Sequence, residues 1–280
     1  MAEIKPFKAV RPTRDKVSLM ASRSYDSYTP EQREARLKDN PFSFLHVVNP
    51  GYKYAQIIEG EKRYNLVRNR YQEFKEDGVL IKEQKPCYYI YKIVNHDAEV
   101  FNGIIAAAST QDYEKDIIKK HEDTLEYKEE IFVKYLKTVG FNAEPVLLTY
   151  PDNDALAGII SSVMQTRAEY EFTTTHRDTH YLWPLSETKL VSEISEIFKQ
   201  MPKLYIADGH HRSSSSCLLA QQLAQENNNH TLKDPYNYFM SFLIPESDLK
   251  IFEFNRLIKD LNGLSKEAFL IRLDFSFRIE

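Results

Sequence analysis

The sequence predicts a mixed α+β fold. Two patterns support this: amphipathic segments with helical spacing are interspersed with short apolar runs typical of strands, and the two kinds do not alternate strictly. Strict alternation would instead favour a doubly wound sheet. A chain of 280 residues can form one large domain or two modest ones. We expect a single mixed unit over 1–280, with a possible N-terminal subdomain over 1–110 and a core over 111–280.

The first part of the chain is predicted to hold two helices and three strands. Thr29 is a suitable N-cap for the first helix, and Gly78 is a suitable stop for the second. The residues Asn95–Asp97 separate two apolar runs and indicate a hairpin. The predicted helices cover 30–37 and 62–77, and the predicted strands cover 44–48, 88–94 and 100–107.

The second part continues with helices and strands in irregular order. Thr124, Asp154 and Ser186 are the predicted helix caps, and Gly140 ends the helix before it. Helical spacing predicts an inward face that includes Ile131 and Phe132. The predicted helices cover 111–120, 128–139, 154–164, 186–198 and 217–225, and the predicted strands cover 145–150, 170–175, 179–183, 204–207, 238–244 and 251–254.

The end of the sequence, 275–280, alternates apolar and polar residues and resembles the middle of a strand. A domain seldom stops there, so we expect that a C-terminal part of the domain is missing.

Composition excludes several classes of function. There are 37 Lys and Arg against 41 Asp and Glu, giving a net charge of −4, which offers no electrostatic reason to bind nucleic acid. Long apolar runs and a signal peptide are absent from the sequence, so we expect a cytoplasmic protein without a membrane partner. Cys87 and Cys217 sit among apolar residues and are predicted to be buried. The oligomeric state is left open.

The most informative motif is the run Asp208–Arg212, with sequence DGHHR, between an apolar strand-like stretch and a serine-rich helix. A strand that turns through glycine into a helix points backbone N–H groups and a positive dipole end at one place. Arg212 can grip two phosphate oxygens at once. The run therefore predicts an anion site. The alternative is that Asp208 merely caps the helix.

This motif resembles the signature turn of the ParB/sulfiredoxin-like superfamily, and more narrowly a ParB/Spo0J-like family of unassigned function. The resemblance extends over nearly the whole chain. Free-serine kinases carry a very similar turn, whereas sulfiredoxins place a cysteine there that this chain lacks. The segments that carry the resemblance are Arg11-Pro12, Tyr25-Asp26, Asn40–Val47, His121–Thr124 with Lys128, Asp208–Arg212 and Phe254–Arg256.

The resemblance implies a nucleotide-binding core and nucleotide phosphates as ligands of the turn. It suggests ATP, ADP or another nucleotide with Mg²⁺ as cofactor, and a small hydroxyl metabolite, such as a free amino acid, as phosphate acceptor. The catalytic candidates are Asp208, His210, His211, Glu122 and His121. The phosphate-binding candidates are Gly209, His211, Arg212, Ser213, Ser214 and Lys128.

Two other functions stay open at this stage. A nucleotide-binding regulator without turnover would fit a ParB-like protein, although DNA binding is not expected from this chain. A metal-dependent hydrolase would use His121, His210 and His211 as ligands if their side chains converge. We assign no metal ligand from sequence alone. His46 reads as structural, and His176 with His180 lies in a predicted hairpin, where a metal site is not favoured.

Overall fold

The computed structural model describes residues 1–54, 56, 58–252 and 257–278. The chain divides into two compact units, Met1–Leu249 and Lys250–Glu280. The mixed α+β class predicted from sequence is confirmed in the first unit. Among the described residues, no helix has both the length and the apolar character needed to cross a membrane.

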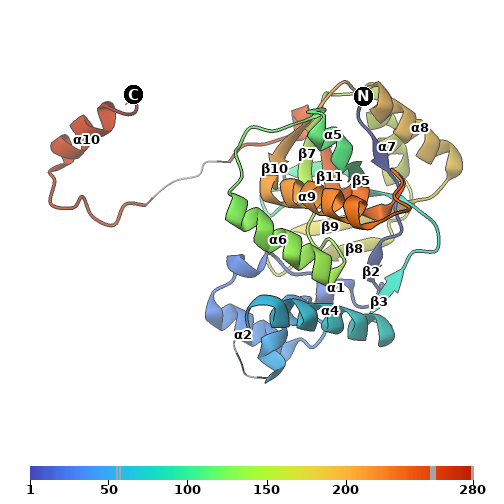
Figure 1. The fold of residues 1–280 in the computed structure, drawn as a ribbon, viewed down its shortest axis with the longest axis horizontal. Coiled ribbons are helices and arrows are strands. Elements are labelled where there is room, and N and C mark those ends of the chain that lie inside the picture. Colours follow the sequence, from blue (N-terminus) through green and yellow to red (C-terminus); the bar gives the residue numbers. More distant parts are fainter. Residues whose placement is uncertain (55, 57, 253–256, 279–280) are drawn as a thin grey trace. The chain divides into compact units, whose positions relative to one another are not determined.

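A mixed nine-stranded sheet organises the described part of the first unit (Figure 1). The strand order is β6-β10-β7-β11-β5-β4-β9-β8, with β1 beside β5. The pairs β6–β10 and β7–β11 are parallel, and the others are antiparallel. The strands are β1 (Ile4–Lys5), β4 (Tyr88–Val94), β5 (Val100–Ser109), β6 (Ile118–Lys119), β7 (Val146–Tyr150), β8 (Tyr170–Thr173), β9 (Thr179–Leu185), β10 (Leu204–Asp208) and β11 (Tyr238–Pro245). A small separate sheet pairs β2 (Val10–Pro12) with β3 (Leu80–Lys82).

The helices of the described residues include nine in the first unit and one in the second. Residues Thr29 and Asn153 cap two of them with side-chain oxygens. The helices are α1 (Val17–Met20), α2 (Pro30–Asp39), α3 (Leu45–Val48), α4 (Gly60–Glu76), α5 (Thr110–Glu114), α6 (Glu126–Val139), α7 (Asp154–Met164), α8 (Thr188–Gln200), α9 (His210–Glu226) and, in the second unit, α10 (Lys266–Asp274). Short 3-10 helices in the described part of the chain include Tyr25–Ser27, Pro50–Tyr54, Pro235–Asn237 and Glu246–Asp248.

The main core lies between the sheet and the helices α7 and α8. Alternate residues of β7 point into it, and Tyr150 meets Phe198 of α8 edge to face, with ring centroids 5.2 Å apart. Each large side chain buried there contributes about 1.5–3 kcal/mol to stability. A second core cluster joins α4 to α6, where Tyr64 and Tyr135 make an edge-to-face contact with centroids at 5.3 Å. These two clusters hold α6 and the sheet edge in place.

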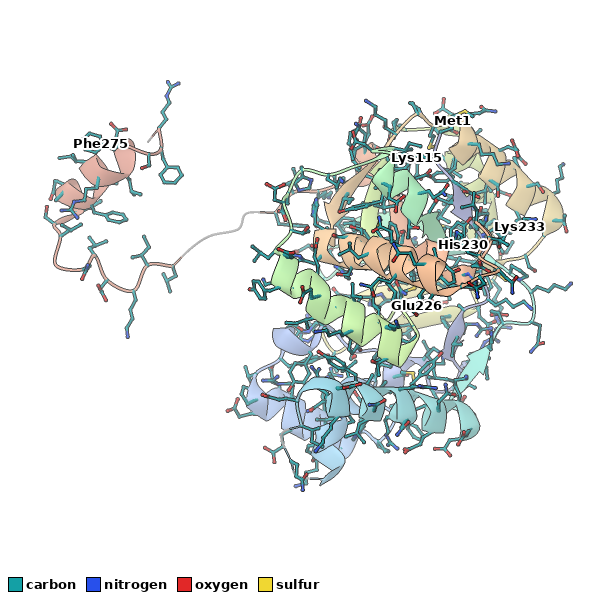
Figure 2. All side chains as sticks on the ribbon, in the orientation of Figure 1. Met1, Lys115, Glu226, His230, Lys233 and Phe275 are labelled. Atoms are coloured by element: carbon teal, nitrogen blue, oxygen red, sulfur yellow. The ribbon has the colours of Figure 1, made fainter. Side chains whose placement is uncertain are left out.

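Helices α6 and α9 lie side by side in front of the strands (Figure 1). Lys137 of α6 donates to Glu226 at the end of α9 at 2.6 Å, and Glu226 is labelled in Figure 2. The serines at the start of α9 are small and buried, which allows close packing. The pair α6–α9 therefore fixes the start of α9 relative to the sheet.

Several predictions of local structure are wrong. The expected strand 44–48 is the short helix α3, in which Leu45 and Val47 are both fully buried. The expected helix 111–120 stops at Glu114, and Asp116 takes a positive φ of 56° before β6 begins. The expected strand after 275 is a turn that extends α10, since Phe277 N–H donates to the Leu273 carbonyl at 2.8 Å.

Three predicted helix caps are also wrong. Leu125, Asn153 and Glu187 stand at the N-cap positions in place of Thr124, Asp154 and Ser186. The inward face predicted for α6 is only partly right. Val139 is buried and Tyr135 packs against the second core cluster, whereas Ile131 and Phe132 are exposed. The strand expected over 251–254 falls largely outside the described residues, and 251–252 form no strand.

Candidate functional site

The DGHHR run forms the junction between β10 and α9. Asp208 ends the strand, Gly209 takes a φ of 102°, and α9 begins at His210. The helix opens with a bond from Ser213 N–H to the Gly209 carbonyl at 3.0 Å. The N–H groups of the three preceding residues therefore have no partner within the helix. No side chain caps this end, so the capping role considered for Asp208 is wrong.

Parallel pairing of β10 with β6 explains how distant residues meet here. Leu204 pairs with Ile118 and Tyr205 with Lys119, so both strands end at the same edge of the sheet. His121 and Glu122 follow β6 just as His210 follows β10. Clefts at the carboxyl ends of parallel strands are common ligand sites.

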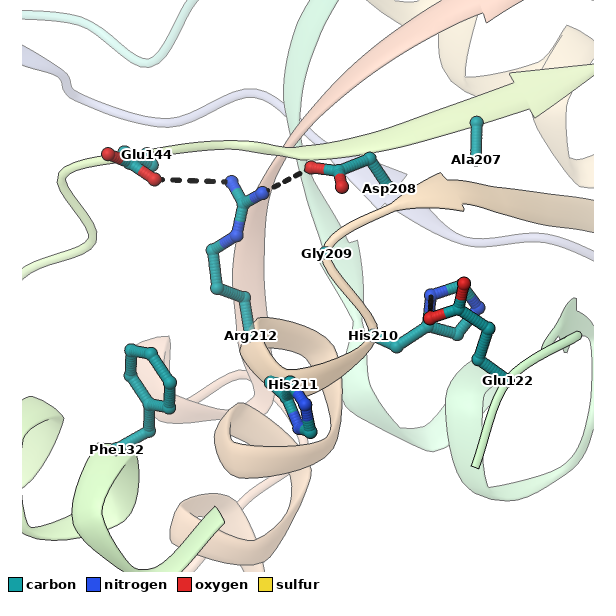
Figure 3. Close-up of a pocket in the computed structure, with 9 residues that line it drawn as sticks. All are labelled: Glu122, Phe132, Glu144, Ala207, Asp208, Gly209, His210, His211 and Arg212. Atoms are coloured by element: carbon teal, nitrogen blue, oxygen red, sulfur yellow. Dashed lines mark hydrogen bonds and ion pairs between the residues drawn. The ribbon is translucent and has the colours of Figure 1, made fainter. Parts of the chain in front are cut away.

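A pocket of about 280 Å³ opens at this edge (Figure 3). It combines the glycine turn with carboxylates, imidazoles and a guanidinium, and Phe132 supplies an aromatic wall from α6. The lining residues are Glu122, Phe132, Glu144, Ala207, Asp208, Gly209, His210, His211 and Arg212.

Arg212 folds back over the turn. Its Nη2 lies 2.5 Å from Asp208 Oδ2, and its Nη1 donates to the Pro145 carbonyl and lies 3.8 Å from Glu144 (Figure 3). A Cβ added to Gly209 would meet the guanidinium at 3.2 Å, so the turn leaves room for this side chain. These partly exposed ion pairs add little to stability, and their effect is to position the guanidinium.

The pocket carries excess negative charge. Three carboxylates, those of Glu122, Glu144 and Asp208, line it with one guanidinium. A bare polyphosphate would meet repulsion from them, whereas a phosphate accompanied by a divalent cation would not. The arrangement therefore suits an anion that arrives together with a cation.

Two histidines and a glutamate form a cluster beside the turn. His210 is only 6% exposed; its Nδ1 lies 3.6 Å from Glu122 Oε2, and Glu122 Oε1 lies 3.9 Å from His121 Nε2. The imidazoles of His121 and His210 meet edge to face at 4.4 Å. Burial lowers the pKa of His210, and the neighbouring His121 lowers it further. The ring of His210 is therefore held neutral at pH 7, as a ligand or base requires.

Of the other predicted site residues, Ser213, Ser214 and Lys128 lie apart from the pocket lining, and His211 belongs to it. The Ser213 hydroxyl donates to the carbonyls of Gly209 and His210, at 3.2 and 3.0 Å. The buried Ser214 donates to Glu129, and Lys128 is half-buried on α6 without lining the pocket. His211 lines the pocket, and within the described part of the chain its Nδ1 is buried without a hydrogen-bond partner.

The remaining histidines and the N-terminal segment join other parts of the first unit. His46 lies in α3, and its Nε2 is 3.2 Å from the carbonyl oxygen of Asn40, as expected for a structural histidine. His180 stacks on Tyr91 and Phe172, while His176 is exposed. Arg11 pairs with Glu83 at 2.5 Å, away from the pocket lining. Tyr25 packs at the α2–α3 cluster, and the side chain of Asp26 lies outside the described residues.

Sequence reasoning missed Glu144 and Phe132 as site residues. Glu144 comes just before β7, which pairs with β10 and so brings this loop to the turn. Phe132 was assigned to the inward face of α6. A cue existed for Glu144, because it immediately precedes a predicted strand, but only strand order reveals which strands are neighbours.

Comparison with known proteins identifies the family. The family model described as protein of unknown function (DUF1015) matches residues 4–280, so the chain belongs to that family. No curated protein and no solved structure matches the chain.

The resemblance to the ParB/sulfiredoxin-like superfamily is therefore wrong, because the matching family is a different one. A short strand–glycine–helix turn with an arginine binds anions through its backbone N–H groups and its guanidinium, and such turns occur on unrelated folds. Such a motif identifies a kind of site more reliably than it identifies an ancestor. The segment Phe254–Arg256, cited for the resemblance, lies outside the described residues.

Proposed function

We propose that the protein binds a nucleotide by its phosphates at Gly209–Arg212 and transfers a phosphoryl group to a small hydroxyl metabolite, such as a free amino acid. The observation that carries the proposal is the junction of β10 and α9. Three N–H groups without intrahelical partners, a guanidinium and an open pocket coincide there. Backbone N–H groups and Arg are the donors that phosphate sites use.

Charge complementarity supports a nucleotide that arrives with a divalent ion. Asp208 and Glu144 hold the Arg212 guanidinium between them. Their carboxylates are the oxygen ligands that Mg²⁺ prefers, together with the phosphates it accompanies. Arg212 would exchange part of its pairing with these carboxylates for the phosphate oxygens. Binding is therefore expected to require the cation.

In the proposed phosphoryl transfer, the protein forms no covalent bond to the substrates. The acceptor oxygen forms a bond to the terminal phosphorus of ATP or ADP, the bond to the bridging oxygen breaks, and the shortened nucleotide leaves. Asp208 and Glu122 are the candidates to take the hydroxyl proton, because both carboxylates line the pocket. Positioning and charge stabilisation supply most of the rate in such reactions.

Pocket size favours a small acceptor. About 280 Å³ holds the phosphate end of a nucleotide and a few heavy atoms of a second molecule, and sites for whole drug-sized ligands begin near this volume. The nucleoside would lie at the mouth, where Phe132 offers an aromatic face.

A thermal-shift and turnover screen tests the proposal. The full chain is heated with ATP or ADP, with and without Mg²⁺, alongside Arg212→Ala and the matched control Arg68→Ala, an exposed arginine on α4. We expect Mg²⁺-dependent stabilisation of the wild type and of Arg68→Ala, and a loss of affinity in Arg212→Ala of about 10- to 100-fold, the worth of a charge-assisted hydrogen bond.

Transfer of labelled phosphate to small alcohols and hydroxy amino acids is then measured. Absence of any nucleotide-dependent shift in the wild type would overturn the binding site. A shift without transfer to any acceptor would overturn the kinase activity and leave a nucleotide-binding protein.

A further inference from the structure

We propose that His121, Glu122 and His210 form a binding site for one transition-metal ion of the Zn²⁺ class. One potential ligand atom from each residue lies within 4.8 Å of the other two. The three residues come from two segments, the loop after β6 and the first residue of α9. The inference rests on this geometry and does not depend on the proposed nucleotide chemistry.

The distances fit shared coordination better than direct pairing. Glu122 points one oxygen toward each imidazole, at 3.6 Å from His210 Nδ1 and 3.9 Å from His121 Nε2. A charge-assisted hydrogen bond would be about 2.7–2.9 Å long, so neither contact is one. Two ligands on a tetrahedral zinc with bonds near 2.1 Å stand about 3.4 Å apart. The two glutamate–histidine distances are close to this value, and all three pairs of ligand atoms lie within 4.8 Å. His121 and Glu122 are exposed, so rotation of their side chains can bring the three ligand atoms to bonding distance of one ion.

The donor set selects the kind of metal. Two imidazoles and one carboxylate suit Zn²⁺ and its neighbours in the first transition row, whereas Mg²⁺ strongly prefers oxygen ligands. Three protein ligands also leave at least one coordination position open, which is typical of catalytic sites. His210 and Glu122 both line the pocket, so that position would face it.

The surroundings of His210 favour a fixed ligand. Its side chain is buried at the start of α9, and its Nε2 lies 3.5 Å from the His121 backbone N–H. That long contact places the two segments together before any ion binds. A divalent ion here would also offset the carboxylate excess of the pocket. Asp208 would then remain as the base candidate for the proposed transfer.

The test is a titration of the metal-free full chain with Zn²⁺ alone by calorimetry, with Co²⁺ as a spectroscopic probe of coordination. His121→Ala and Glu122→Gln remove exposed ligands and should fold normally. The matched controls are His176→Ala and Glu171→Gln, both exposed and outside the cluster. We expect one ion per chain, an affinity loss on the order of 100-fold in each cluster variant, and none in the controls.

Arg212→Ala separates this proposal from the previous one. It should bind Zn²⁺ as the wild type does even if it loses nucleotide, because Arg212 is not a ligand. In the wild type and the controls, Co²⁺ should show the visible absorption of a site with imidazole and carboxylate ligands. Failure of the wild type to bind Zn²⁺ saturably, or equal affinity in wild type, His121→Ala and Glu122→Gln, would overturn the metal site.

Discussion

Two histidines withdrawn from water, His180 and His210, differ in what their ring nitrogens face. His180 lies between Tyr91 and Phe172, and its Nδ1 is 2.7 Å from the Tyr91 hydroxyl. His210 lies against a second histidine and a carboxylate, and its polar contacts with the described residues are long, at 3.5 and 3.6 Å. The ring of His180 is therefore hydrogen-bonded and stacked within the protein, whereas the ring nitrogens of His210 remain available to a ligand.

The contrast shows why spacing alone misleads for histidine. His176 and His180 have the i, i+4 spacing associated with zinc on a helix, yet they lie in and beside a hairpin. His121 and His210 are far apart in sequence and meet through parallel strands. Partners in space, and not positions in sequence, decide which histidine is structural.

The largest expected effect is the loss of stability on removing the structural histidine His180. His180→Ala removes two ring contacts and a partly buried hydrogen bond, and should lower the free energy of unfolding by about 2 kcal/mol. His121→Ala removes an exposed ring and should change it by less than about 0.5 kcal/mol. Urea denaturation of both variants measures this. Equal losses would contradict the division into structural and available histidines.

A smaller effect concerns the turn that presents His210. Gly209→Ala must hold an alanine at a φ of 102° with its Cβ 3.2 Å from the Arg212 guanidinium. We expect a cost of about 1–2 kcal/mol from backbone strain, together with loss of the Mg²⁺–nucleotide shift. Gly60→Ala is the control, since Gly60 has a φ of 61° and no atom near the added Cβ.

Thermal denaturation with and without Mg²⁺–ATP measures the stability and the nucleotide-dependent shift of both glycine variants. Gly60→Ala should lose stability but keep the nucleotide shift. If Gly209→Ala also kept it, the shape of the turn would not matter for the ligand.

The smallest effect is a pH dependence. Burial lowers the pKa of His180 in the folded protein, partly opposed by Asp178. Below about pH 6.5, the ordinary histidine value, the unfolded chain therefore takes up the proton first. Stability should be fully present above that value and should fall on acidification, until the folded protein is protonated as well.

Urea midpoints at about pH 7 and about pH 5 measure this loss. His180→Gln should show a smaller loss than the wild type, and the exposed His176→Gln an unchanged one. The stability of both variants will still depend on pH, because burial also lowers the pKa of His46 and of His210. An identical loss in His180→Gln and wild type would assign the effect to other groups.

Elements with a strong local signal were predicted well. Thr29 caps α2 and Gly140 ends α6, both as expected. The structure adds that Thr29 and Gln32 form a capping box and that Gly140 is left-handed. The hairpin around Asn95–Asp97 also formed between β4 and β5. Cys87 and Cys217 are buried, and burial raises the pKa of both thiols, to about 12 for Cys217.

Elements governed by distant contacts were not predicted. Residues 44–48 satisfy a strand pattern, yet they lie in and beside the short helix α3, with Leu45 and Val47 fully buried. Ile131 and Phe132 satisfy a helical face, yet α6 packs on α4 and α9 through other residues. The family resemblance was wrong for a related reason. A short motif such as DGHHR indicates a kind of binding site, and the same kind of site occurs on unrelated folds.

By itself, the sequence determined the α+β class and most segment types, and it indicated the run Asp208–Arg212 as the candidate site, because these follow from residue spacing and from the conformation of one glycine. Tertiary structure alone decided which groups join that run. Parallel pairing of β6 with β10 brings His121 and Glu122 to His210, and pairing of β7 with β10 brings Glu144 to Arg212. Strand order depends on how the whole core is buried, and no local pattern encodes it.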